Sequence, residues 1–172
     1  YSIIGLPCSQ ILKVFGNTIT IESNGNVIEQ VESNDPLNFI EEYQARFKVP
    51  ELDGSPRFNG GLVGYFAYDT VRYIEPKLAA NCPDDPLGTP DILLMLSDQL
   101  VVFDNLSGKL MLIYHADPSV EDAYQLAQTV LDLLVHRLRT EICAQPNSPS
   151  TPTDIKESDF ISGFSEQGFK DG

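Results

Sequence analysis

The sequence predicts an α/β fold of the α+β type, with a mixed, largely antiparallel sheet that is built from hairpins and covered by amphipathic helices. Three observations support this prediction. An Asn24-Gly25 turn lies between two segments of alternating apolar residues, which is a strong hairpin signal. Two further apolar, β-branched segments, 92–103 and 109–115, flank a polar turn. Two other segments repeat apolar residues at helical spacing and provide cover for a sheet.

Residues 1–32 are expected to be almost entirely β-structure. Strands are predicted at 1–6, 11–15, 18–23 and 27–32. Asn24 and Gly25 join the last two, because both residue types tolerate the positive φ angles of a tight turn. We therefore expect a hairpin over 18–32.

A helix is expected directly after this hairpin. Asp35 is placed to be its N-cap and Pro36 its first residue, a pair that suits the start of a helix. The apolar face consists of Leu37, Ile40, Tyr43 and Phe47. The helix should end near Val49-Pro50, and the polar residues 50–59 indicate a loop.

The stretch Gly60–Glu75 combines three glycines, four aromatic rings and a single Arg. Glycines at positions 60, 61 and 64 indicate close approach of another backbone or ring, or dihedral angles closed to other residues. Asp69 is expected to cap the turn that holds Arg72. We expect Arg72 to pair with Glu75 or Asp69, in a structural role rather than a ligand-binding one.

Residues 76–90 contain four prolines and are expected to be irregular. The segments 92–103 and 109–115 are then predicted to form a hairpin through 104–108. In the second segment, apolar side chains point to both faces, which predicts a central strand covered on both sides.

A long helix is predicted from Ser119 to about Arg139. Ser119 is expected to be its cap, with Glu121 and Asp122 in the first turn and basic residues in the last turn, as the helix dipole favours. The predicted apolar stripe consists of Val120, Ala123, Tyr124, Ala127, Val130, Leu131, Leu134 and Leu138. This stripe requires a sheet or another helix to cover it.

Composition changes sharply after this helix. The Pro-, Ser- and Thr-rich residues 144–157 predict an interdomain linker. We therefore expect one domain over 1–143 and the opening of a second, truncated domain over 158–172. Because the chain starts without Met and stops abruptly, we expect it to be a fragment of a longer protein.

Charge and cysteine content limit the partners and the compartment. The net charge of −14 repels phosphate backbones, so a nucleic-acid partner is not expected. Apolar runs are far shorter than the roughly 20 residues that span a bilayer, so no membrane association is expected. The three cysteines show neither disulfide nor zinc spacing, and no secretory signal is visible, which favours the cytoplasm.

A search for chemistry finds no catalytic set. His115 and His136 have no nucleophile motif beside them, and structural or solvated roles are favoured for both. Asp84-Asp85 lacks the spacing of a calcium loop. Gly60-Gly61-x-x-Gly64 leads into aromatic strand residues rather than a helix N-terminus, which argues against a phosphate loop. We therefore predict no catalytic and no metal-binding residues in this chain.

The strings Tyr-Phe-Ala-Tyr-Asp and Val-Arg-Tyr-Ile-Glu within Gly60–Glu75, together with Asp85–Asp91, resemble the N-terminal region of the anthranilate synthase component I family. The resemblance covers nearly the whole chain. It implies an N-terminal regulatory and scaffold domain that packs on a larger chorismate-utilising domain.

The same resemblance implies a lyase of tryptophan biosynthesis. Such an enzyme converts chorismate and ammonia into anthranilate and pyruvate with Mg²⁺, and the ammonia comes from a glutamine amidotransferase partner, component II. The family's catalytic and metal-binding residues lie in the C-terminal domain. This chain alone is therefore expected to be inactive.

In the resembled family tryptophan binds between the two domains as a feedback inhibitor. Tyr1 and Ser2 match the edge of that tryptophan pocket by position, so the resemblance implies an effector-binding role for both. The family element that lines the rest of the pocket precedes the strand in which this chain begins.

Two alternatives stay open from the sequence. The chain could be the N-terminal domain of component I of aminodeoxychorismate synthase, the related enzyme of the folate pathway. It could also act as a non-catalytic module that binds an amino acid or docks the amidotransferase.

Overall fold

The computed structural model of the 172-residue chain describes residues 1–81, 85–140, 156, 159, 163 and 165–171. These residues divide into two compact units, Tyr1–His136 and Arg137–Gly172. The first unit contains every described strand and both of the sheets that they form. The fold class predicted from the sequence, α+β with antiparallel strands, is confirmed.

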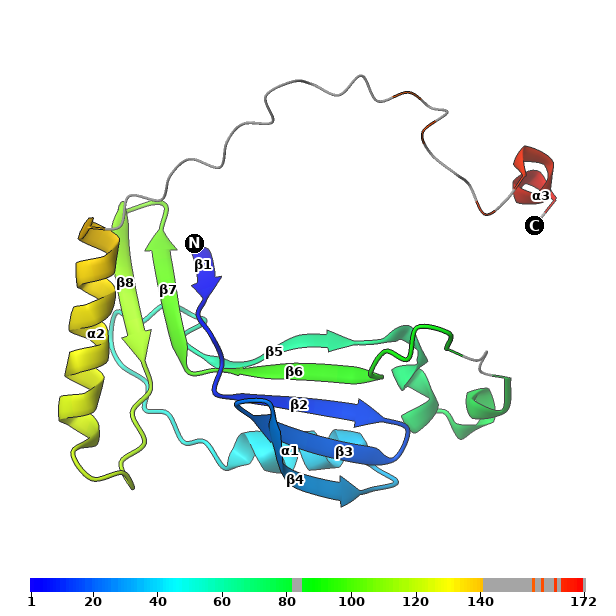
Figure 1. Cartoon of the computed structure of the whole chain (residues 1–172), viewed down its shortest axis with the longest axis horizontal. Helices are drawn as coiled ribbons and strands as arrows, with labels where there is room; N and C mark the ends of the chain where they lie inside the picture. The colour runs from blue at the N-terminus through cyan, green and yellow to red at the C-terminus, as the bar shows by residue number, and fades with distance from the viewer. Residues whose placement is uncertain (82–84, 141–155, 157–158, 160–162, 164, 172) are drawn as a thin grey trace. The chain divides into compact units, whose positions relative to one another are not determined.

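The larger sheet has five strands in the order β4-β3-β2-β6-β5, and all of its neighbours are antiparallel (Figure 1). Its strands are β2 (Gln10–Phe15), β3 (Thr18–Ser23), β4 (Asn26–Glu32), β5 (Gly61–Phe66) and β6 (Ile92–Ser97). The sheet therefore joins segments that are far apart in the sequence.

The β3–β4 hairpin confirms the prediction from Asn24-Gly25. Asn24 has φ 50° and Gly25 has φ 78°, the positive pair that a type I′ turn requires. Thr18 lies opposite Glu32, so the two strands match over their whole length apart from one register shift after Ile21. The shift is a local bulge and leaves the pairing intact.

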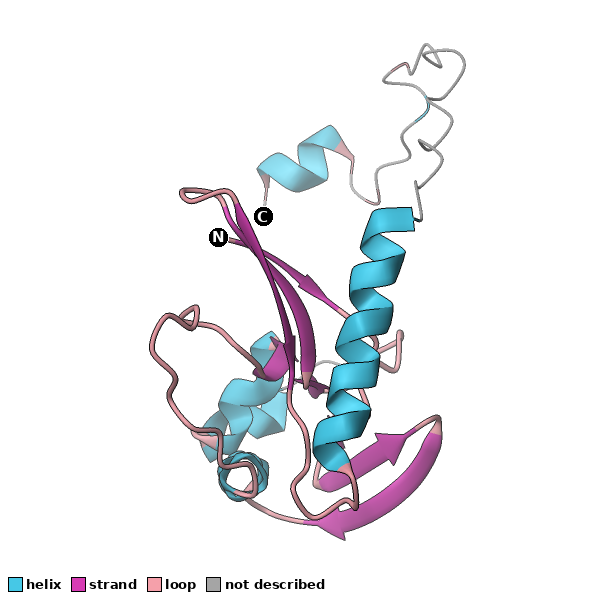
Figure 2. Cartoon of the chain, turned by 90° about the vertical axis from the view of Figure 1, so that its left-hand side faces the viewer, coloured by secondary structure: helices cyan, strands magenta, loops and turns pink. Residues whose placement is uncertain are grey.

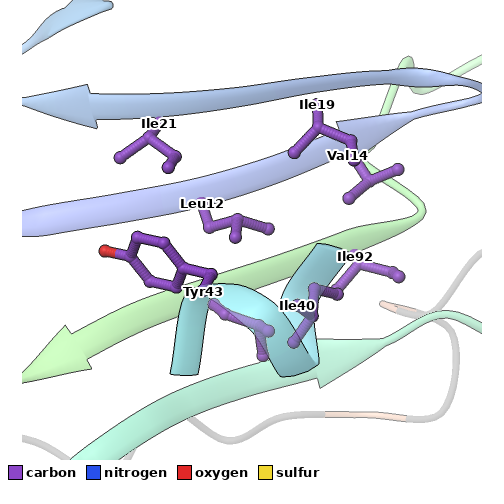
Figure 3. Close-up of a cluster of buried hydrophobic side chains, with 8 residues drawn as sticks. Leu12, Val14, Ile19, Ile21, Ile40, Tyr43 and Ile92 are labelled. Carbon is purple, nitrogen blue, oxygen red and sulfur yellow. The ribbon is translucent and has the colours of Figure 1, made fainter. Parts of the chain in front are cut away.

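Helix α1 (Pro36–Ala45) covers one face of the five-stranded sheet. As predicted, Pro36 is its first residue and the Asp35 carboxylate accepts a hydrogen bond from the backbone N–H of Asn38. Figure 3 shows Ile40 and Tyr43 pointing toward Leu12 of the sheet. These side chains belong to a buried cluster made of Leu12, Val14, Ile19, Ile21, Ile40, Tyr43, Ile92 and Leu94.

The helix is shorter than the sequence indicated. It ends at Ala45 rather than near Val49-Pro50, and Phe47 is 42% exposed instead of continuing the apolar face. Arg46 at the C-cap pairs with Glu29 of β4 at 2.8 Å, and its guanidinium lies over the Tyr43 ring. This contact fastens the end of α1 to the edge of the sheet.

The smaller sheet has three antiparallel strands in the order β1-β7-β8. Its strands are β1 (Ser2–Gly5), β7 (Gln99–Asp104) and β8 (Lys109–Tyr114). The predicted hairpin through 104–108 is confirmed as β7–β8.

Two predictions about this region were wrong. The segment 92–103 is two strands rather than one, because the chain leaves the larger sheet at Asp98 and enters the smaller one. Among the described residues β8 pairs with β7 and lies at the edge of the sheet, and the central strand of this sheet is β7. Side-chain alternation alone does not tell which strand of a hairpin gains a second neighbour.

The second predicted helix occurs as α2 (Ala123–Thr140), with Arg137 and Arg139 in its last turn as expected. Its predicted start was wrong. The Ser119 hydroxyl donates to Asp117 rather than capping the helix, and Asp122 has φ 58°, which a helical residue does not adopt. Ala127 on α2 is buried, whereas Tyr124 is 71% exposed and lies outside the buried stripe.

The part of α2 that belongs to the first unit runs beside β7 and β8 in both views (Figures 1 and 2).

The predicted linker 144–157 lies outside the described residues apart from Lys156, and the boundary at 143 stays a prediction. In the second unit a short helix, α3 (Glu166–Lys170), is capped by the Ser165 hydroxyl. No helix among the described residues is long and apolar enough to cross a membrane.

Candidate functional site

The two segments that carry the family resemblance, Gly60–Glu75 and Asp85–Asp91, meet at one end of the five-stranded sheet. β5 leads into a 3₁₀ helix, η1 (Tyr68–Tyr73), while Asp91 directly precedes β6. β5 and β6 are antiparallel, with Phe66 opposite Ile92, so the end of one strand lies beside the start of the other. The Ala67 N–H donates to the Asp91 carbonyl at 2.8 Å, which closes this end of the pair.

Asp91 is the centre of a polar cluster that we call the Arg72–Asp91 cluster, made of Gly16, Arg72, Tyr73 and Asp91. Its Oδ1 lies 2.5 Å from the Arg72 guanidinium. Its Oδ2 accepts from the Gly16 N–H at 2.7 Å and lies 2.9 Å from the Tyr73 hydroxyl. The cluster therefore joins η1, the β2–β3 turn and the start of β6.

Burial and charge both act on this cluster. Burial acts to lower the pKa of Arg72, but its hydrogen bond with Tyr73 and the charge of Asp91 outweigh this effect and raise the pKa above its ordinary value. Burial, together with the hydrogen bond to Asp91, raises the pKa of Tyr73 to about 12. At neutral pH the cluster therefore holds a charged Arg72 guanidinium and a neutral Tyr73 phenol.

The sequence predicted the wrong partners for this Arg. Arg72 pairs with Asp91 rather than with Glu75 or Asp69, and Glu75 instead pairs with Lys77 at 3.0 Å. Asp69 does not cap η1, because the N-cap position is Ala67 and no side chain bonds to the N-terminus there. Pairing of β5 with β6 brings in a partner 19 positions away in the chain, which local spacing does not reveal.

An open cleft of about 590 Å³ lies beside the cluster. Its lining comprises Phe15, Gly16, Ala67, Asp69, Arg72, Asp85, Pro86, Gly88, Thr89, Pro90 and Asp91. The Asp85 carboxylate accepts from the N–H groups of Leu87 and Thr89 and from the Thr89 hydroxyl, which lowers its pKa. Asp85 therefore holds the turn at 85–89, and Asp84 lies outside the described residues.

Among the described residues that line the cleft, the one cation, Arg72, already faces the carboxylate of Asp91. Three carboxylates, Asp69, Asp85 and Asp91, also line it, which disfavours an anion there. The arrangement instead stabilises the junction of three chain segments, as a partly buried ion pair with additional hydrogen bonds does.

Two glycines of the Gly60–Glu75 stretch, Gly60 and Gly64, are closely approached by other parts of the chain, as the sequence indicated. A Cβ on Gly64 would overlap the carbonyl oxygen of Leu93 on the neighbouring strand. Gly60 has φ 148°, and a Cβ there would lie 2.6 Å from His115 Nε2 and 2.9 Å from the Ser97 carbonyl oxygen. Close approach of backbone and ring therefore requires glycine at both positions.

His115 has the structural role that the sequence favoured. Its Nε2 lies 2.6 Å from the carbonyl oxygen of Asn59, which can only accept, so Nε2 carries the proton and donates. This bond holds the loop before β5 against the end of β8.

Tyr1 and Ser2, the predicted effector-binding residues, lie at the start of β1 in the smaller sheet. Tyr1 is 65% exposed, and the Ser2 hydroxyl is 3.2–3.3 Å from the side-chain amide of Asn105. The structure does not bring them to the Arg72–Asp91 cluster, which belongs to the larger sheet. Their role in effector binding stays a prediction.

Asp98 is the residue that sequence reasoning missed. It lies where the chain passes from β6 in the larger sheet to β7 in the smaller one. Its Oδ2 accepts from the Ser9 hydroxyl at 2.8 Å, and Ser9 lies where the chain first passes between the sheets, from β1 to β2. The Oδ1 of Asp98 is buried without a hydrogen-bond partner among the described residues. A lone Asp inside the apolar run 92–103 was the available signal.

Comparison with known proteins assigns the chain to a family. Residues 7–172 match the model of the family described as chorismate binding enzyme. The chain is 48% identical over 176 residues to anthranilate synthase component 1 of Pseudomonas aeruginosa, covering 99% of this chain and 35% of that protein. It is 31% identical over 174 residues to the protein of the same name from Saccharomyces cerevisiae, covering 99% of this chain and 32% of that protein.

A solved structure has a similar fold. Anthranilate synthase component I from Streptococcus pneumoniae matches with a TM-score of 0.62 and 26% identity, covering 81% of this chain and 29% of that chain. The present chain thus spans about a third of the length of the curated relatives that it matches.

Proposed function

The chain belongs to the family of chorismate-binding enzymes, and from this membership we propose that it forms the N-terminal part of the component 1 subunit of an anthranilate synthase. The observation that carries this proposal is the 48% identity to the Pseudomonas aeruginosa relative of that name, over 99% of this chain. The similar fold of the Streptococcus pneumoniae protein supports it.

In this proposal the whole enzyme is a lyase that converts chorismate and ammonia into anthranilate and pyruvate for tryptophan biosynthesis. A glutamine amidotransferase subunit, component II, supplies the ammonia. The present chain acts as a scaffold and regulatory part, and the chemistry takes place in the rest of the subunit. This division of roles is supported by the described lining of the cleft beside the Arg72–Asp91 cluster, where the one cation, Arg72, faces the Asp91 carboxylate.

The Mg²⁺ ion of the proposed reaction is assigned to the rest of the enzyme. Magnesium takes oxygen ligands, usually one or two carboxylates with water and substrate. Across residues 1–81, 85–140 and the described part of the C-terminal segment, no group of three or more His, Cys, Asp or Glu side chains is placed to hold a metal ion. The residues described here do not fit a complete protein-built metal site, so no step of the reaction is assigned to them.

Feedback inhibition by tryptophan belongs to the same proposal, with Tyr1 and Ser2 at the edge of the effector site. The exposure of Tyr1 leaves its ring available to a ligand or to a neighbouring part of the protein. A cytoplasmic location is also proposed, and it is supported by cysteines that lack disulfide or zinc spacing in the sequence.

The experiment is to join this chain to the part of the Pseudomonas aeruginosa relative that lies beyond the matched third. The fusion is supplied with chorismate, ammonia and Mg²⁺, and anthranilate fluorescence is followed. We expect anthranilate to form with the fusion and none with the isolated chain. Formation of 4-amino-4-deoxychorismate instead would assign the chain to the folate-pathway enzyme.

A second measurement separates the enzyme part from a free-standing binding module. Isothermal titration calorimetry of the isolated chain with tryptophan should show no substantial heat if the pocket needs residues beyond this chain. Saturable binding by the isolated chain would favour an autonomous amino-acid-binding module.

A further inference from the structure

The two sheets of the first unit bury separate sets of apolar side chains. The buried cluster beneath α1 takes its members from α1 and from β2, β3 and β6 of the larger sheet. Leu100, Val101 and Val102 of β7 are also buried, but they are not members of that cluster. Among the described residues, no strand of one sheet pairs with a strand of the other. How the sheets are joined therefore depends on the places where the chain passes between them.

Two side-chain hydrogen bonds fasten the end of the smaller sheet to the larger one. The carboxylate of Asp98, directly before β7, accepts from the hydroxyl of Ser9, directly before β2, at 2.8 Å. His115, directly after β8, donates from Nε2 to the carbonyl oxygen of Asn59 at 2.6 Å. Figure 1 shows the passages from β1 to β2 and from β6 to β7 at the same corner of the unit. We call these two bonds the polar seam.

The polar seam holds both flanks of the strand that leads into the smaller sheet. β6 continues into β7 through Asp98, and the neighbours of β6 in the larger sheet are β2 and β5. Ser9 lies at the start of β2, and Asn59 lies two positions before β5. The two bonds therefore resist rotation of the smaller sheet about Asp98 toward either side.

The Asp98 half of the seam is only partly satisfied. Its Oδ2 has the Ser9 hydroxyl, but its Oδ1 is buried without a donor among the described residues. Burying an acceptor without a donor costs free energy, and an exposed hydroxyl such as that of Ser9 can bond to water instead. Opening the seam therefore loses a bond of modest net free energy and hydrates Oδ1, so this fastening can be released.

Gly60 and Gly61 lie where such a release would bend the chain, at the junction of Asn59 and β5. Their φ angles are 148° and 123°, in the region that favours glycine. A Cβ at position 60 would overlap His115, but a Cβ at position 61 would meet no atom within 4 Å other than those of its chain neighbours. Position 61 therefore requires glycine for its backbone angle rather than for space. Residues that absorb changes of φ and ψ are what a hinge needs.

We propose that the polar seam is the latch of a hinge, and that the smaller sheet turns relative to the larger one when the two bonds open. Asp98 and His115 are the latch residues on the smaller sheet, and Ser9 and Asn59 are their partners. β1 pairs with β7, so it turns with the smaller sheet. The inference goes beyond the proposed function and does not depend on it.

The test measures the relative orientation of the sheets in the full chain, using residual dipolar couplings of backbone N–H groups. In the parent chain, couplings from both sheets should fit one alignment tensor. In the double variant Ser9→Ala/His115→Ala, couplings of β1, β7 and β8 should fall by roughly a third or more relative to those of the larger sheet, as expected when one part becomes mobile. A common tensor in this variant would overturn the proposal. Two tensors in the parent chain would also overturn it, because the seam would then not hold the sheets.

The matched control is Ser119→Ala/His136→Ala, which makes the same two changes outside the seam. The Ser119 hydroxyl also bonds to an Asp carboxylate, that of Asp117 at 2.7 Å, but within one loop. This control should keep the common tensor, and an equal loss in both double variants contradicts the latch. If Ser9→Ala/His115→Ala does not fold, as judged by circular dichroism, Ser9→Ala and Ser119→Ala are compared singly. Ser9→Ala should then show a smaller reduction and Ser119→Ala none, and equal couplings in the two would contradict the proposal.

Discussion

At the scale of single residues, the glycines of the motif are explained by what surrounds them. Gly64 faces the backbone of β6 so closely that a side chain would overlap the Leu93 carbonyl, and backbone atoms cannot move aside as a flexible side chain can. The sequence indicated close approach at this position. It did not indicate which strand approaches.

We predict that Gly64→Ala destabilises the chain by about 3 kcal/mol, the upper part of the range for overpacking. Urea unfolding followed by circular dichroism measures the change. The matched control is Gly5→Ala on β1, where a Cβ would have no atom within 4 Å and φ is not positive. We expect the control to change stability by well under 1 kcal/mol, and an equal effect of both would contradict the clash.

The Arg72–Asp91 cluster gives a second prediction at this scale. Tyr73→Phe should cost about 1 kcal/mol at pH 7, because the hydrogen bond of the hydroxyl is lost. The folded-state pKa of Tyr73 is about 12, above the ordinary value of 10.0, so the folded chain holds the phenol proton more tightly than the unfolded chain. Stability from this group is therefore complete below pH 10 and is lost as the pH rises toward 12.

The variant has no phenol at position 73 and escapes this loss. The difference in unfolding free energy between the parent chain and Tyr73→Phe should therefore narrow from pH 9 to pH 11. Urea titrations at both pH values measure it. A difference that stays constant over this range would show that the phenol is not held in the neutral form.

At the scale of elements, α1 begins where the local sequence predicted. The Asp35 carboxylate accepts the Asn38 N–H at 3.0 Å, and Pro36 occupies a position where no backbone N–H is needed. The end of the helix was less predictable, because Arg46 leaves the apolar pattern to pair with Glu29 on β4.

We predict that Asp35→Ala destabilises the chain by about 1 kcal/mol, because one N–H of the first turn loses its partner. Asp35→Asn is the control, since the Asn side chain also accepts at an N-cap and should retain most of the stability. Thermal unfolding of the three proteins provides the comparison. Equal losses in both variants would indicate that the charge, rather than the cap, is what matters.

The break between β6 and β7 shows what local patterns miss at this scale. Residues 92–103 satisfy every requirement of a single long strand except for the Asp at position 98. In the structure Asp98 bonds to Ser9, at the neighbouring crossing between the two sheets. The Asp therefore marks a change of sheet, which depends on a residue 89 positions away.

At the scale of the whole molecule, the strands, the core cluster and α1 all precede residue 144. The predicted domain boundary at 143 therefore leads to a clear expectation. A chain truncated after Cys143 should have the same urea midpoint as the full chain, since it retains every described strand and both long helices.

The control for this truncation is a chain that ends at Asp122 and lacks α2. It should be less stable, because Ala127 and its neighbours on α2 no longer cover the strands beside them. Urea unfolding of the three chains measures the boundary. A lower midpoint for the chain ending at Cys143 would place the boundary later in the sequence.

What the sequence by itself determined are the features that depend on neighbours along the chain. The Asn24-Gly25 turn and the start of α1 at Asp35-Pro36 both follow from local dihedral angles and spacing. The family resemblance also came from contiguous strings of residues, and the family match agrees with it.

Only the tertiary structure decided which strands share a sheet, which carboxylate faces Arg72, and which sheet face is left open. These features depend on contacts between segments tens of residues apart. The spacing of apolar residues within one segment does not show which other segment it contacts. Asp91 reaches Arg72 because β5 and β6 are neighbours, and Met95 is 36% exposed on the face opposite the one that packs against α1.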